Sequence, residues 1–493
     1  MRSAGFPFLF GIHGRRATRE TVGLLRRSGA CGVLLLARNI ETAAQTKALT
    51  EELTQRLGRP LLFSVDHEGG WVLRFRQGVT ALPGNCALGR AADDKLAYAT
   101  GRQMALELRP LGIQLNLAPV LDVLTPNYNP GIGIRSFGPD PALAGRLGSA
   151  MIRGLQDHGV SACAKHFPGK GAATVDAHVA LPTIRLGRSA FERGHLRPFK
   201  DAVRSGVACV MTSHVRYPAL DGQVATFSEK ITRRLLRERL GFKGVVIADD
   251  LCMGAVSARM PIQEAAVKAF AAGHDLLILA HDRQAQEEAA QLMEQALADG
   301  LVDREGLEAS CARIAALLER PASPQRASAR EGQLLARRVA RRGIALARRG
   351  ALALPLKPSK RPLLVVLPDF SEVAQRFTFE GGPRGPEREI RGRLSRWGRA
   401  RLLRAPVESG DLNGLAKAVE EAERVLFFCF EARRFPGQKA ALRLLSRRAA
   451  DKTAVALVRG RWDLDWADPK MTALDAGGYR LCQLSAVLDE VLA

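Results

Sequence analysis

The residues from Lys165 to Pro182, KHFPGKGAATVDAHVALP, combine ionisable side chains with glycines and prolines. Lys165 and His166 end an apolar run, and an Asp-x-His pair, Asp176 and His178, follows in the loop. A histidine such as His178 is suited to proton transfer near neutral pH, and Asp176 could fix its tautomer. Because polar groups removed from water cost free energy unless they are paired, this cluster favours a reaction site over a turn-rich loop with a satisfied histidine.

Two adjacent carboxylates, Asp249 and Asp250, follow the apolar run of GVVIADDL. Neighbouring side chains in extended backbone point to opposite faces, so one could act as a nucleophile or electrostatic stabiliser while the other braces the loop. A carboxylate nucleophile opposite a proton donor is the arrangement that retaining glycoside cleavage needs. Four further residues could hold the hydroxyl or carbonyl groups of a polar ligand: Asp66, Arg74, Lys165 and His166.

A metal centre is the competing chemistry, because hydrolysis can also use a bound divalent ion. Four residues could serve as its ligands: His166, His178, His214 and Asp249. Amidohydrolase-like barrels typically carry an H-x-H pair early in the chain, whereas His13 stands alone there. Lys165 beside His166 would also repel a cation. The pattern therefore predicts a site with no metal and no cofactor.

The elements that must position these residues are short apolar runs, each followed by a segment of helical pattern. Eight such runs occur, at residues 8–13, 32–38, 61–66, 113–117, 161–166, 208–214, 245–250 and 276–280. Continuous apolar runs of this length are typical of buried parallel strands. Eight units predict an α/β fold, a (β/α)8 TIM-like barrel, with a doubly wound open sheet as the alternative. The polar residues cluster at the carboxyl ends of the runs, where barrel enzymes build active sites.

The residue composition of the sequence changes after Arg320, so the predicted barrel domain covers residues 1–320. Residues 321–360 are predicted to hold a Pro/Ser/Ala-rich linker, PASPQRASAREG, and an amphipathic helix over residues 334–350. Residues 361–493 alternate between strand and helix patterns and predict a smaller C-terminal α/β domain. Within it, residues 379–393 are rich in arginine and glycine and predict a surface loop.

The composition fits a globular protein of two or three domains, with 493 residues, 46% of them hydrophobic and 25% charged. No run approaches the ~20 apolar residues that cross a bilayer, and no export signal is recognisable, so we expect a cytoplasmic protein without a membrane partner. The net charge of +23 could indicate nucleic-acid binding, but the cations are dispersed and aromatic residues make up only 5%. A basic solvated surface is the preferred interpretation. The eight cysteines stand singly and predict neither disulfides nor a zinc site.

Four stretches of the sequence resemble glycoside hydrolase family 3, in particular its β-N-acetylglucosaminidase branch of bacterial cell-wall recycling. They are SVDHEGGWVLRF, GIGIRSFGPDP, KHFPGKGAATVDAHVALP and GFKGVVIADDLCMGAV. The third is the most specific, and the second half of the chain resembles the C-terminal domain of two-domain members. The resemblance implies a hydrolase that releases terminal β-linked N-acetylglucosamine from peptidoglycan fragments. A small carbohydrate is then the expected partner, and no nucleic acid is expected; the sequence leaves the oligomeric state open.

The resemblance also implies roles for single residues. Asp249 matches the nucleophile, His178 the acid–base histidine and Asp176 its partner. Five residues match positions that bind the sugar: Asp66, Arg74, Arg135, Lys165 and His166. Arg135 and the choice of Asp249 over Asp250 rest on the resemblance alone.

Some positions depart from the family pattern, and some functions remain open. Lys170 stands where many members have histidine and Trp71 where arginine is common, so both could alter the pocket rim; Ala177 and Ala248 replace frequent serines. A neutral histidine does not repel phosphate as a glutamate would, so phosphorolysis is one alternative. A β-glucosidase of the same family and a noncatalytic barrel that binds carbohydrate or nucleic acid are the others.

Overall fold

The computed structural model describes residues 6–75, 77–357, 362–376, 386–395, 397 and 399–492. The chain divides into two compact units. The first unit comprises residues 1–68, 72–80 and 92–332, and the second comprises residues 69–71, 81–91 and 333–493. The second unit therefore contains two short segments that come from the N-terminal part of the chain.

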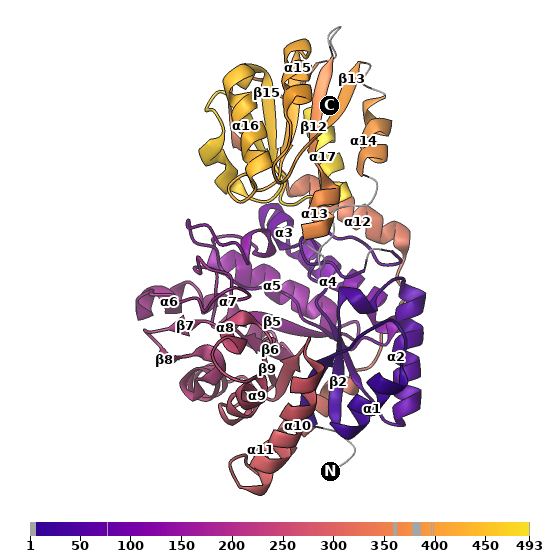
Figure 1. Cartoon of the computed structure of the whole chain (residues 1–493), viewed down its shortest axis with the longest axis vertical. Coiled ribbons are helices and arrows are strands. Elements are labelled where there is room, and N and C mark those ends of the chain that lie inside the picture. The colour runs from indigo at the N-terminus through magenta and orange to yellow at the C-terminus, as the bar shows by residue number, and fades with distance from the viewer. Residues whose placement is uncertain are drawn as a thin grey trace. The chain divides into compact units, whose positions relative to one another are not determined.

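Eight parallel strands close into a barrel in the first unit (Figure 1). They are β1 (Phe6–Gly11), β2 (Ala30–Leu35), β3 (Leu62–Val65), β4 (Leu115–Asn116), β5 (Ser161–Phe167), β6 (Cys209–Thr212), β9 (Val245–Ala248) and β10 (Leu276–Leu279). Each strand pairs with its neighbours along the chain, and β1 pairs with β10. Every predicted strand overlaps one of these, so the (β/α)8 barrel is confirmed and the open-sheet alternative is wrong.

Helices follow the strands and surround the barrel. They are α1 (Arg19–Arg27), α2 (Ala43–Leu57), α4 (Asp94–Leu108), α5 (Pro141–Gln156), α6 (Arg188–Arg193), α7 (Arg197–Arg204), a π-helix (Lys230–Arg239), α8 (Gly254–Ser257), α9 (Ile262–Ala271), α10 (Arg283–Ala298) and α11 (Arg304–Leu318). Several begin at a side-chain cap: Asp93, Asp140 and Asp303 each accept backbone N–H bonds from the first turn. Each such cap contributes about 1 kcal/mol and fixes where its helix begins. A short hairpin, β7 (Arg216–Tyr217) and β8 (Asp221–Val224), extends the loop after β6.

The barrel strands are buried on both faces, which explains their continuous apolar sequences. One core cluster joins residues from all eight strands, among them Leu9, Leu62, Leu115, Ile247 and Ile278. Helix α11 adds Ile314 and Leu317 to this cluster. A packed interior of this kind leaves the strand ends as the place where polar side chains can gather.

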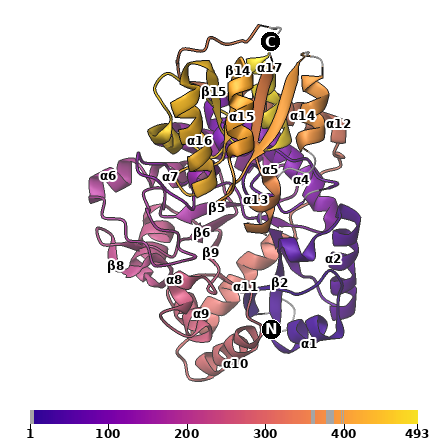
Figure 2. The same cartoon turned by 45° about the horizontal axis from the view of Figure 1, so that its top comes forward.

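The second unit is built on a six-stranded sheet in the order β11-β16-β15-β14-β12-β13. The strands are β11 (Ala345–Arg348), β12 (Leu363–Pro368), β13 (Ala400–Ala405), β14 (Arg424–Cys429), β15 (Thr453–Leu457) and β16 (Thr472–Asp475). Only β11 is antiparallel to its neighbour. Helices α15 (Asn413–Glu421) and α16 (Pro436–Arg448) lie together on one side, and α14 (Pro386–Leu394) and α17 (Leu481–Val491) on the other (Figure 2). The unit also includes α3 (Asn85–Ala91) and α13 (Phe370–Arg376), and the predicted C-terminal α/β architecture is confirmed.

Two local predictions around this unit are wrong. The helix predicted over residues 334–350 is α12 (Ala329–Arg342), and residues 345–348 instead form β11 at the edge of the sheet, where they pair with β16. Pairing with a distant strand overrides the local helical pattern there. Residues 386–394 form α14 rather than a loop, and residues 379–385 lie outside the described residues. In the described part of the chain, no helix is long and apolar enough to cross a bilayer.

Candidate active site

A buried cluster of opposite charges lies at the carboxyl ends of β3 and β5. The ammonium of Lys165, which is 2% exposed, lies 2.6 Å from Asp66 Oδ1 and 2.8 Å from Glu68 Oε1. Arg135, from the loop after β4, donates two hydrogen bonds to Glu68, at 2.8 and 2.7 Å. Arg74 Nη2 lies 3.5 Å from Asp66 Oδ2. The structure therefore brings four of the five predicted sugar-binding residues together.

Glu68 joins this cluster although no role was predicted for it. It lies two residues after Asp66 in the stretch SVDHEGG, and that spacing of two carboxylates after a strand was the signal available. Its side chain is buried and accepts both bonds of the planar Arg135 guanidinium, a geometry that gives strong and well-directed hydrogen bonds.

The residues of the cluster keep one another charged. Burial raises the pKa of Asp66, but Lys165 and Arg74 outweigh burial and bring that pKa to about 2. Burial likewise raises the pKa of Glu68, and Arg135 and Lys165 reverse that shift, so the pKa is lowered. Burial lowers the pKa of Lys165, while the two carboxylates raise it above its ordinary value. The result is a rigid set of charged donors and acceptors suited to binding hydroxyl and carbonyl groups.

His166, the fifth predicted sugar-binding residue, is held by Asp122. Its Nδ1 lies 2.7 Å from Asp122 Oδ2, and the backbone N–H of Lys170 donates to Asp122 Oδ1 at 2.6 Å. Burial, followed by the nearby cations of Lys170 and Arg135, lowers the pKa of His166 well below its usual value. The ring is therefore neutral, with its proton on Nδ1 facing the carboxylate and Nε2 left as an acceptor. Burial raises the pKa of Asp122 to about 6, in spite of Lys170.

Two glycines fix the backbone on either side of Lys170. Gly169 has φ +118°, a conformation that side chains rarely adopt. A Cβ on Gly171 would lie 1.8 Å from the carbonyl oxygen of Val123, so only glycine lets the chain pass there. The Lys170 side chain is nearly buried, and its ammonium lies 3.9 Å from Asp249 Oδ2.

The Asp-x-His pair forms a hydrogen-bonded dyad in the loop after β5. His178 Nδ1 lies 2.8 Å from Asp176 Oδ1, and the His178 backbone N–H donates to the same oxygen at 3.0 Å. Burial raises the pKa of Asp176, but the hydrogen bonds from His178 outweigh it and hold that pKa far below its ordinary value. Asp176 therefore stays anionic and can stabilise an imidazolium, while the His178 side chain is 67% exposed and accessible to a ligand.

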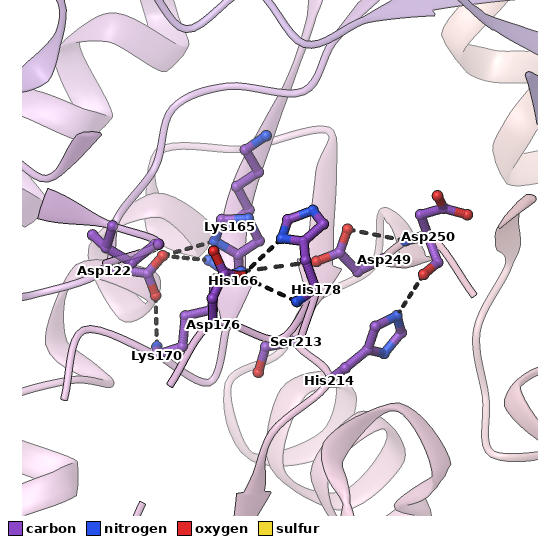
Figure 3. A network of polar contacts seen from close by, with 12 residues as sticks. Asp122, Lys165, His166, Lys170, Asp176, His178, Ser213, His214, Asp249 and Asp250 are labelled. Carbon is purple, nitrogen blue, oxygen red and sulfur yellow. Dashed lines mark hydrogen bonds and ion pairs between the residues drawn. The ribbon is translucent and has the colours of Figure 1, made fainter. Parts of the chain in front are cut away.

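The two carboxylates after β9 have different surroundings. Asp250 Oδ1 accepts the backbone N–H groups of Cys252 and Ala280, at 3.1 and 3.0 Å, so this carboxylate braces the loop. Asp249 Oδ1 accepts only the Asp250 N–H among the hydrogen bonds described, and its Oδ2 faces Lys170. Figure 3 shows the contacts of Asp249 with Lys170 and Asp250, and the Asp176–His178 pair as a separate contact. Asp176 and Asp249 both act electrostatically on the Lys170 ammonium. This geometry favours Asp249 as the reacting carboxylate.

The three histidines of the alternative metal site are engaged in other contacts. Nδ1 of His166 faces Asp122 and Nδ1 of His178 faces Asp176. His214 uses both ring nitrogens, at 2.6 Å from Thr226 Oγ1 and 3.0 Å from the Asp250 carbonyl oxygen. Within the described residues, no group of three or more His, Cys, Asp or Glu side chains is placed to hold a metal ion. The arrangement instead suits acid–base and nucleophilic chemistry.

Trp71, expected at the rim of the pocket, is 6% exposed and belongs to the second unit. Its ring packs against Tyr479 and Phe430, and the Arg459 guanidinium lies 3.4 Å from the ring centroid. An aromatic–cation contact of this kind is a packing feature of that unit. An effect of Trp71 on the pocket rim stays a prediction.

The first unit is similar to known proteins. Residues 8–317 match the family model described as Glycosyl hydrolase family 3 N terminal domain. A protein of Thiobacillus denitrificans named Beta-hexosaminidase is 41% identical over 268 residues, which are 53% of this chain and 74% of that protein.

Solved structures extend the likeness to the second unit. The structure of a glycoside hydrolase family 3 beta-N-acetylglucosaminidase from Paenibacillus sp. has a TM-score of 0.91 and 32% identity, covering 99% of this chain and 95% of that one. NagZ from Neisseria gonorrhoeae, solved in complex with N-trifluoroacetyl-D-glucosamine, has a TM-score of 0.58 and 32% identity, covering 69% of this chain and 98% of that one.

Proposed function

Because this chain belongs to glycosyl hydrolase family 3, we propose that it is a retaining exo-β-N-acetylglucosaminidase. The observation that carries the proposal is the Asp176–His178 hydrogen bond beside the Asp249 carboxylate, since Asp176 and Asp249 both act electrostatically on the Lys170 ammonium. A proton donor and a nucleophilic carboxylate are the two groups that retaining cleavage requires. The likeness to the Paenibacillus beta-N-acetylglucosaminidase over 99% of the chain supports N-acetylglucosamine as the sugar.

In the first step, Asp249 attacks the anomeric carbon and the bond from that carbon to the leaving oxygen breaks. Protonated His178 donates its proton to the leaving oxygen, and Asp176 stabilises the imidazolium beforehand. The products are a glycosyl ester on Asp249 and the free aglycone alcohol. The charged cluster of Asp66 and Lys165 would bind the sugar during this step, with Glu68, Arg135 and Arg74 supporting it.

In the second step, neutral His178 takes a proton from water, and the resulting nucleophile attacks the anomeric carbon. The ester bond to Asp249 breaks, the carboxylate is restored and the sugar leaves with its original β configuration. Lys170 lies beside the departing carboxylate and would stabilise its returning charge.

We further propose that the substrate is an N-acetylglucosamine-capped fragment of peptidoglycan, as the motif resemblance implies, and a cytoplasmic location remains a prediction. Phosphate could replace water as the acceptor, because neutral His178 and cationic Lys170 would not repel it. Formation of N-acetylglucosamine 1-phosphate in phosphate buffer would reveal this route. Hydrolysis remains the preferred proposal, because no residue of the site is committed to phosphate alone.

The decisive experiment is release of nitrophenol from the β-N-acetylglucosaminide and the β-glucoside. We expect the wild type to cleave the first and not the second, and Asp249→Ala to lower kcat/KM by at least about 10³-fold. Azide should rescue Asp249→Ala and give the α-glycosyl azide, because azide can occupy the space of the missing carboxylate.

A mechanism-based fluorinated glycoside should label Asp249, as read by peptide mass. Labelling of Asp250 instead would overturn the assignment of the nucleophile. Failure of the wild type to cleave any N-acetylglucosaminide would overturn the proposed function itself.

A further inference from the structure

The loop that carries the dyad, residues 171–182 and here called the acid–base loop, contacts a turn that follows the nucleophile. This turn, Met253, Gly254 and Ala255, is called the 253–255 turn. The N–H of Ala255 lies in the first turn of α8, where the helix offers it no acceptor, and it donates to the Ala177 carbonyl oxygen at 3.0 Å. This hydrogen bond ties the middle of the acid–base loop to another segment of the described chain.

Side-chain packing reinforces this contact. Ala177, Met253 and Ala255 form a small apolar cluster with exposures of 4%, 6% and 1%, and Leu181 packs against it. A Cβ added to Gly254 would lie 2.7 Å from the His178 carbonyl oxygen. Real side chains essentially never come so close to a backbone atom, so any residue other than glycine must displace either the loop or the turn.

The 253–255 turn is itself fixed to the strand end that carries Asp249. Leu251 donates its N–H to the Ile278 carbonyl oxygen at 3.0 Å, and Met253 donates to the Asp250 carbonyl oxygen at 3.0 Å. The Asp250 carboxylate binds the N–H groups of Cys252 and Ala280. The turn is therefore held by β10 and by the residue next to the nucleophile, so its position follows that of Asp249.

We propose that the 253–255 turn positions the acid–base loop, and that Gly254 is a positioning residue for His178. This inference rests on the proposed glycosidase function and deepens it. The turn links proton donor and nucleophile: the backbone of His178 rests on Gly254, and Gly254 follows Asp249 by five residues. Ala177, small and buried, is part of the same contact.

The test uses Gly254→Ala, in which the new Cβ meets the His178 carbonyl, with Gly222→Ala as the matched control. Gly222 has no heavy atom within 4 Å of an added Cβ, and neither glycine has a left-handed φ, so the control isolates the contact. The readout is kcat/KM, which reports bond cleavage in the first step, for two N-acetylglucosaminides. One has a dinitrophenol leaving group that departs unprotonated, and the other is a disaccharide whose leaving alcohol needs a proton.

We expect Gly254→Ala to lower kcat/KM for the disaccharide by about 10- to 100-fold, a partial loss of the ~10²- to 10⁴-fold that general acid catalysis contributes, and for the dinitrophenyl glycoside by less than about 3-fold. Gly222→Ala should match the wild type on both. An equal loss on both substrates, or no loss on either, would overturn the proposal while leaving the glycosidase function intact. If Gly254→Ala fails to fold, Met253→Ala loosens the same contact and must show the same selective loss. A wild type inactive on both substrates would instead refute the function on which the inference rests.

Discussion

Replacing Lys165 with methionine should destabilise the first unit in a pH-dependent way. The ammonium lies between two buried carboxylates, at 2.6 Å from Asp66 and 2.8 Å from Glu68, and methionine keeps much of its volume without its charge. Arg135 still pairs with Glu68, whereas Asp66 is left with Arg74 at 3.5 Å. The variant therefore leaves Asp66 as a poorly compensated buried charge.

The expected cost at pH 7 is about 3–5 kcal/mol, the usual effect of removing one partner of a buried ion pair. The pKa of Asp66 gives a separate measure, because it is lowered from 3.8 to about 2. This lowering of the pKa corresponds to about 2.5 kcal/mol of stability. Because the folded pKa is the lower one, this stability is present above pH 4 and is lost as the pH falls through 2. Without Lys165 the carboxylates protonate at higher pH, so the deficit of the variant should shrink between pH 7 and pH 4.

Urea unfolding followed by circular dichroism at both pH values would measure this deficit. Lys47→Met is the control, because Lys47 forms an exposed pair with Glu51 at 3.6 Å and should change stability by no more than about 0.5 kcal/mol. The double variant Lys165→Met/Asp66→Asn should recover at least about 1 kcal/mol at pH 7. A double variant no more stable than Lys165→Met, or a deficit that does not change with pH, would refute the reasoning.

Two further predictions concern other buried carboxyls. Asp122→Asn should raise KM for the aryl N-acetylglucosaminide about 10-fold in steady-state assays, because His166 loses the carboxylate that holds its Nδ1 proton. A hydrogen bond to a charged group of this kind contributes about 1.5–3 kcal/mol. An unchanged KM would contradict this prediction. In the second unit, burial raises the pKa of Asp463 from 3.8 to about 7, so the cost of its charge is absent below pH 4 and complete above pH 7. Asp463→Asn should therefore stabilise the chain by up to about 4 kcal/mol at pH 8 and by much less at pH 4.5. Urea unfolding followed by tryptophan fluorescence would measure both values, and equal effects at the two pH values would contradict this prediction.

The barrel could be predicted from sequence because its signal is local. A strand buried on both faces must be apolar along its whole length, so each strand could be recognised as a continuous apolar run. The polar residues after these runs indicated the end of the barrel that carries the site. Asp66 and Lys165 were predicted as separate ligand-binding residues, and the structure shows them in direct contact. The assignment of Asp249 as nucleophile and His178 as acid–base residue stays a prediction.

The structural features that were not predicted from the sequence depend on contacts with residues far away in the chain. Glu68 was overlooked because a carboxylate in a glycine-rich turn is usually solvated. Two residues far along the chain, Arg135 and Lys165, make it part of the cluster. Residues 345–348 continue a helical pattern, yet their backbone pairs with β16 more than 120 residues away. The packing partner of the Trp71 ring could not be predicted either, because Tyr479 lies far along the chain. In each case the partner in the decisive contact cannot be inferred from the neighbouring residues in the sequence.

The assignment of residues 69–71 and 81–91 to the second unit bears on how such a chain can be recombined or shortened. A cut in the linker after residue 320 looks like a clean boundary between modules. It would nevertheless remove Tyr479 and Arg459 from around the Trp71 ring, and Asp475 from the Arg90 guanidinium. A truncated barrel would thus expose a large aromatic side chain, Trp71, and leave Arg90 without its carboxylate partner. An exchange of the C-terminal domain for another one would therefore also require substitutions in residues 69–71 and 81–91.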